Sequence, residues 1–143
     1  MTSLAAIRKC RSAARDYNRT AGEMLDNLIT SDEHGMFIGR NVSAIISNRE
    51  AIAEQTNSKN PNDRVIARST ENINTCIHVI KSRLERLGAT SEEVANVVNS
   101  LNNADYQSVT LAVLKLMARK NPGMHQRKYE QALKMAANKQ KQR

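Results

Sequence analysis

The chain has 143 residues and a mass of 16.0 kDa, the size of one typical domain with its own core. Only four residues are aromatic and none is Trp, so the core must be aliphatic. Two cysteines, Cys10 and Cys76, are too few for a disulfide scaffold and lack zinc-site spacing. We expect both to be small buried residues of a reducing compartment.

The sequence shows no apolar run of the ~20 residues that cross a bilayer, no secretory signal peptide and no lipidation pattern. We therefore expect a protein without membrane contact that is cytoplasmic or packaged inside a particle, and not secreted.

The net charge of +8 is concentrated at the two ends of the chain. Residues 115–143 hold nine basic residues and one acidic residue, and residues 1–19 hold five basic residues and one acidic residue. The intervening residues 20–114 carry twelve acidic and eight basic residues. Two basic ends around a mildly acidic middle suggest an anionic partner.

Three long helices are predicted first along the chain. Residues 3–30 place apolar or small residues at alternating intervals of three and four, as one helix face requires, at Ile7, Cys10, Ala14, Tyr17, Ala21, Met24 and Leu28. Residues 36–55 repeat the pattern less regularly, because Arg49 interrupts the stripe of Ile38, Val42, Ile45, Ile46 and Ile52.

The third helix is predicted to begin with Asn60 as N-cap and Pro61 as its first residue. Its stripe is the clearest in the chain and comprises Ile66, Thr70, Ile73, Ile77, Ile80, Leu84 and Leu87. Gly88 is placed to end the helix in a left-handed conformation.

Three shorter helices should follow. Thr90 and Glu93 form a capping-box signature for a helix through Val94, Val97, Val98 and Leu101. Residues 104–120 carry apolar residues on more than one side, which predicts a helix buried nearly all round. Asn121 and Pro122 repeat the cap-then-proline pattern and open a last helix that fades into a polar tail at residues 138–143.

These elements predict an all-α fold, a helical bundle of about five to six helices. Three long N-terminal helices pack antiparallel, and the fifth helix covers one end or an exposed side. We expect residues 1–120 to form the bundle and residues 121–143 a basic C-terminal helix and tail. The heptad faces also permit a homo-oligomer.

The sequence offers no candidate for catalysis, so we expect no enzyme activity and no cofactor. The three histidines, His34, His78 and His125, stand in no catalytic spacing, and the glycines are isolated rather than gathered in a phosphate loop. The acidic pairs Asp32/Glu33 and Glu92/Glu93 fall where helices begin, where carboxylates complement the helix dipole. No spacing indicates a metal site.

The basic residues form a more specific pattern. In the first helix, Arg8, Arg11, Arg15 and Arg19 fall within an arc of about 80°, away from the apolar stripe. In the last helix, Arg127, Lys134 and Lys141 are a heptad apart, with Tyr129, Leu133 and Ala136 predicted to face inward. The predicted third helix instead carries charges of both signs, at Arg83, Glu85 and Arg86. The predicted nucleic-acid-binding residues are Arg8, Arg11, Arg15, Arg19, Arg119, Lys120, Arg127, Lys128, Lys134, Lys139, Lys141 and Arg143.

Such ridges suit the phosphates of duplex nucleic acid better than single strands, which need aromatic stacking platforms. A helix-turn-helix in residues 89–114 is disfavoured, because Asn99 falls at the usual turn glycine and Asp105 at an apolar position. The sequence therefore predicts a non-catalytic structural or assembly protein associated with nucleic acid, such as a virion-internal or nucleoid-type component. The alternative is a helical adaptor or chaperone that binds an acidic protein surface or self-assembles through its heptad faces.

Overall fold

The computed structural model describes residues 33–141, with side chains described up to residue 138. Of these residues 87% are helical and none lies in a strand, which confirms the all-α prediction. The predicted helix at residues 3–30, with Cys10 and its basic residues, lies outside the described residues.

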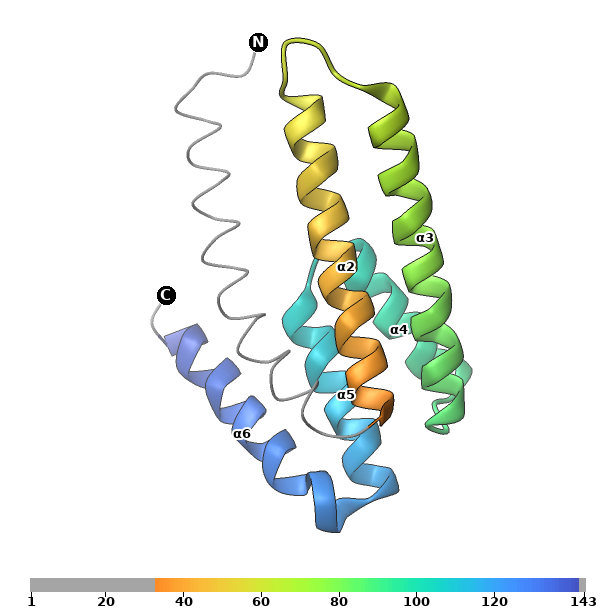
Figure 1. Ribbon diagram of the computed structural model, residues 1–143. Helices are drawn as coiled ribbons and strands as arrows, with labels where there is room; N and C mark the ends of the chain where they lie inside the picture. Colours follow the sequence, from red (N-terminus) through yellow and green to blue (C-terminus); the bar gives the residue numbers. More distant parts are fainter. Residues whose placement is uncertain (1–32, 142–143) are drawn as a thin grey trace.

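Helices α2 (Glu33–Thr56) and α3 (Asp63–Arg86) form a long antiparallel hairpin (Figure 1). The stripe predicted for α2 is buried at Ile38, Val42 and Ile45, whereas Ile46 and Ile52, nearer the loop, are half-buried. All residues from 56 to 64 are exposed, so the loop end of the hairpin projects beyond the core.

The start of α3 differs from the prediction by two residues. Asn62, not Asn60, is the N-cap, because its side chain accepts hydrogen bonds from the backbone N–H groups of Arg64 (3.1 Å) and Val65 (3.3 Å). The Asn62 backbone N–H in turn donates to Gln55 Oε1 at 2.9 Å, which ties the loop to the end of α2. Pro61 therefore precedes the cap instead of opening the helix.

One residue of the α3 stripe was also assigned wrongly. Thr70 is exposed and donates its hydroxyl to Ile66 of its own helix at 2.8 Å, whereas the neighbouring Ser69 is buried. The small side chain of Ser69 permits close approach of α2. The stripe is fully buried only toward the C-terminal end, at Ile80, Leu84 and Leu87.

Helix α3 ends as predicted at Gly88, whose φ of +84° is the left-handed conformation that glycine adopts without strain. Helix α4 (Ser91–Asn102) then begins with the predicted capping box of Thr90 and Glu93. Helix α5 (Tyr106–Lys120) starts two residues later than expected, because Asp105 is its N-cap and accepts from the Ser108 N–H at 3.2 Å.

Helix α5 is central rather than a cover over one end, so that part of the prediction was wrong. It packs against α2, α4 and α6 (Pro122–Lys141), and its buried residues are Tyr106, Val109, Thr110, Val113, Leu114, Leu116, Met117 and Ala118. Its broad apolar surface had predicted burial on most sides, and this is confirmed. The core joins the lower half of the hairpin to α4 and α5 (Figure 1).

Arg49, which interrupts the stripe of α2, joins that helix to α5. Its Nη1 donates to the Tyr106 hydroxyl at 2.7 Å, and its guanidinium lies 5.7 Å from the centroid of the Tyr106 ring. The residue that interrupts the apolar pattern thus makes a polar contact between two helices. Arg83 has a similar role, since it stacks on Phe37 of α2 at 3.9 Å from the ring centroid.

Candidate nucleic-acid interface

Helix α6 holds most of the predicted C-terminal basic residues. Its first turn follows the predicted pattern, because Asn121 O accepts from the N–H groups of Met124 and His125. The helix continues to Lys141, so it includes the first four residues of the segment predicted as a tail. As Figure 1 shows, α6 runs back alongside α5 from the base of the bundle.

The buried side of α6 is defined by His125, Ala132 and Ala136, which are at most 8% exposed. At 100° per residue, Arg127 and Lys134 point roughly opposite to these residues, and both are exposed. Neither side chain makes a hydrogen bond or ion pair within the described part of the chain. We call Arg127 and Lys134 the α6 outer pair.

Other residues of α6 are arranged differently from the prediction. Leu133, which was expected to face inward, is 41% exposed, because the small residues Ala132 and Ala136 form the contact side instead. Lys128 is half-buried and lies away from the outer pair around the helix. The carboxylate of Glu130 accepts from Gln126 at 3.2 Å. Lys139 and Lys141 belong to the last turns of α6, beyond the described side chains.

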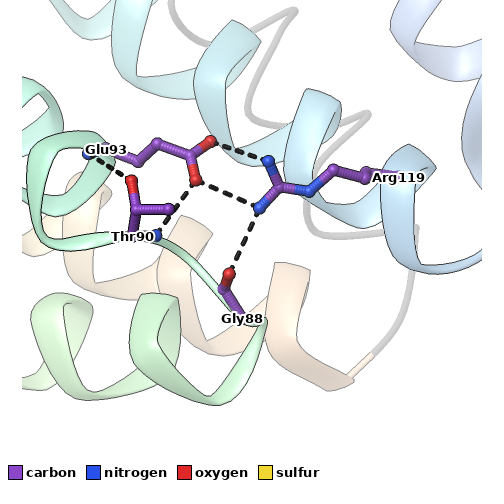
Figure 2. A network of polar contacts seen from close by, with 4 residues as sticks. All are labelled: Gly88, Thr90, Glu93 and Arg119. Atoms are coloured by element: carbon purple, nitrogen blue, oxygen red, sulfur yellow. Dashed lines mark hydrogen bonds and ion pairs between the residues drawn. The ribbon is translucent and has the colours of Figure 1, made fainter.

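Arg119 and Lys120, at the end of α5, make structural contacts, and Figure 2 shows those of Arg119. The Arg119 guanidinium donates from Nη1 to Glu93 Oε2 and from Nη2 to Glu93 Oε1, both at 3.1 Å. Its Nη2 also donates to Gly88 O at 3.2 Å, and Lys120 Nζ donates to Arg86 O at 3.4 Å. Both residues therefore fasten the end of α5 to the turn between α3 and α4.

The same network perturbs one carboxyl group. Glu93 Oε1 accepts from the Thr90 backbone N–H at 3.0 Å, and this bond, followed by the one from Arg119, holds the pKa of Glu93 below its usual value. The Glu92/Glu93 pair was predicted to complement the start of a helix, and both residues lie in the first turn of α4. At Cys76, which is half-buried, burial raises the pKa of the thiol.

The described basic residues include two contrasting groups. Arg49, Arg83 and Arg119 have aromatic or carboxylate partners from other helices. The α6 outer pair and Arg86 are exposed and have no such partner within residues 33–138. The charges of the second group, like those of other exposed basic residues such as Arg64 and Arg68, are available to an anionic ligand.

The predicted residues Arg8, Arg11, Arg15, Arg19 and Arg143 lie outside the described residues. The structure adds Arg86, which the sequence placed in a helix of mixed charge. Its position in the last turn of α3 was the available signal, but nothing in the pattern placed that turn beside the end of α5. A hollow between these two ends, of about 310 Å³, is lined by Arg86, Leu87, Gly88, Arg119 and Lys120.

The helix-turn-helix alignment does not fit the structure. Asn99, which would occupy the turn, lies inside α4, and Asp105 caps α5. A second hollow, of about 700 Å³, lies between α3 and α4, with Val94, Ala95 and Val98 among its lining residues. The charges at its sides, Lys81 and Glu85, are of opposite sign and give it no preference for an anion.

Comparison with known protein families, with curated proteins and with solved structures finds no match to this chain. Within the described residues, no helix combines the length and apolarity needed to span a membrane. The same residues contain no group of three or more His, Cys, Asp or Glu side chains placed to hold a metal ion. Among the described residues, the exposed charges are the remaining functional signal.

Proposed function

We propose that the protein is a non-catalytic helical structural or assembly protein that binds the phosphate backbone of nucleic acid without reading its sequence. The observation that carries this proposal is the α6 outer pair, Arg127 and Lys134, exposed on a helix whose opposite side is buried against α5. An anchored helix holds these charges in fixed positions, about 10.5 Å apart along its axis.

Duplex phosphates are a better target than single strands, because stacking needs exposed aromatic rings. Phe37 is covered by Arg83, Tyr106 is 4% exposed, and Tyr129 packs against the core. The described aromatic residues are therefore engaged inside the fold. Arginine and lysine contacts to phosphates remain, and these position a duplex without specifying bases.

The remaining parts of the proposal rest on the sequence pattern. Arg8, Arg11, Arg15 and Arg19, which lie outside the described residues, are proposed as further phosphate contacts. The protein then acts in the cytoplasm or inside a particle, as a virion-internal or nucleoid-type component, with self-association through apolar helix faces.

The test is a fluorescence-anisotropy titration of the full chain with two short labelled duplexes of unrelated sequence. We expect equal affinity for both, falling steeply between about 50 and about 200 mM salt, with a slope of about 0.9 per phosphate contact. Absence of binding at about 50 mM salt would refute the proposal. In that case binding to an acidic protein, the function of an adaptor or chaperone, becomes the better interpretation.

A further inference from the structure

We infer that the hollow between the ends of α3 and α5 is a binding site for a single phosphate group. The site deepens the proposed function, on which the choice of ligand rests, by assigning one backbone phosphate to a defined place. Its five lining residues include three cations, Arg86, Arg119 and Lys120. Each comes from the last turn of its helix.

The charge balance of the hollow favours an anion. Glu93 is the carboxylate in contact with these cations, and its two oxygens are occupied by Arg119 and Thr90. Glu85 lines the other hollow, between α3 and α4. Three positive charges thus face one negative charge that is already engaged and the partial negative ends of α3 and α5, about −0.5 each, which leaves a net excess of about one positive charge at the hollow.

Two of the cations are held in place while keeping unused donors. Of the five N–H groups of Arg119, three are used by Glu93 and Gly88, so its Nε–H and one Nη1–H remain. Lys120 uses one of three donors, in a long bond of 3.4 Å to Arg86 O. Because these side chains are positioned before a ligand arrives, binding immobilises fewer side chains.

The third cation and the backbone complete the site. The Arg86 side chain is exposed and has no hydrogen bond or ion pair within the described residues, so its planar fork can bind a phosphate through two donors. Gly88 is exposed, and no atom lies within 4 Å of the position of an added Cβ, so its surface is open to a ligand. The hollow, of about 310 Å³, is open to solvent and large enough to admit a phosphate group.

Basic residues at helix C-termini also complement the helix dipole, and that role alone would require no ligand. Removal of Arg86 distinguishes the two roles, because only the phosphate-binding role predicts a loss of phosphate affinity. Arg86 and Lys120 are both exposed, and Lys120 makes a long hydrogen bond of 3.4 Å to Arg86 O, so Arg86→Gln with Lys120→Gln should lower the thermal unfolding midpoint only slightly. Arg64→Gln with Arg68→Gln, on exposed residues near the loop end of α3, is the matched control with the same charge.

The experiment is an NMR titration of the full chain with inorganic phosphate at constant ionic strength, following the Gly88 amide and the Arg119 Nε–H. We expect saturable shifts at both signals in the wild type and the control, and affinity weaker by about tenfold or more in Arg86→Gln/Lys120→Gln. The single variant Arg86→Gln gives the same test should the double variant unfold. Shifts that do not saturate, or that are equal in all proteins, overturn the inference.

A parallel titration with a labelled duplex separates this inference from the proposed function. Duplex binding without a saturable phosphate response overturns the phosphate site and leaves the proposed function standing. A saturable phosphate response without duplex binding supports the site, identifies a free phosphate compound as its ligand, and refutes the proposed function.

Discussion

Removing the charges of the α6 outer pair should weaken the salt dependence of duplex binding by a predictable amount. Arg127→Gln with Lys134→Gln removes two cations that are exposed and have no ion pair within the described residues. Each phosphate contact contributes about 0.9 to the slope of log affinity against log salt, so the slope should fall by about 1.8. Between about 50 and about 200 mM salt, the wild type should therefore lose about twelvefold more affinity than the variant.

Fluorescence anisotropy with a short labelled duplex at several salt concentrations measures both slopes. Glutamine resembles arginine and lysine in helix propensity, so α6 should remain folded, which circular dichroism checks. The matched control, Arg64→Gln with Arg68→Gln, removes the same charge from exposed positions near the loop end of α3. Equal slopes in the two variants would show that only the net charge matters, and would refute the assignment of phosphate contacts to α6.

Three further predictions concern the scaffold that positions these charges. Leu114→Ala removes a fully buried side chain of α5 and should lower the free energy of unfolding by about 3 kcal/mol in urea titrations; a loss below about 1 kcal/mol would contradict its central position. Gly88→Ala should cost about 1–2 kcal/mol for its left-handed backbone, and Gly88→Asn less; equal stabilities would contradict the role of φ. Because the pKa of Glu93 is lowered in the folded state, its carboxylate stabilises the fold above its ordinary pKa of 4.5, and this contribution is lost as pH falls through the lowered value. The stability difference between wild type and Glu93→Gln should shrink over that range in thermal unfolding, and a constant difference would argue against the hydrogen bonds of this carboxylate with the Thr90 N–H and Arg119.

Local signals along the chain predicted the elements of the fold well. The capping box of Thr90 and Glu93, the left-handed Gly88 and the start of α6 at Pro122 depend on contacts within about four residues, and the structure confirms all three. The start of α3 was missed by two residues, because Asn60 and Asn62 are both suitable caps. The backbone N–H groups of the first turn bond to Asn62.

The candidate site was less predictable, because each of its contacts joins residues far apart in the chain. The sequence places Arg119 and Lys120 in a basic segment without indicating that Glu93, Gly88 and Arg86 O accept their hydrogen bonds. Charge counts treat all cations alike. Only the contacts between helices distinguish the cations that are paired from those that are available.

The sequence by itself determined the helical class, the starts of α4 and α6, the end of α3 at Gly88 and the excess of positive charge in residues 115–143, since these follow from local periodicity, capping and composition. Tertiary structure decided that α5 is the central helix, that Arg49 meets Tyr106, and that the C-terminal ends of α3 and α5 share one hollow. The physical reason is that a helix pattern specifies which face is apolar, whereas its partner depends on how several such faces pack together.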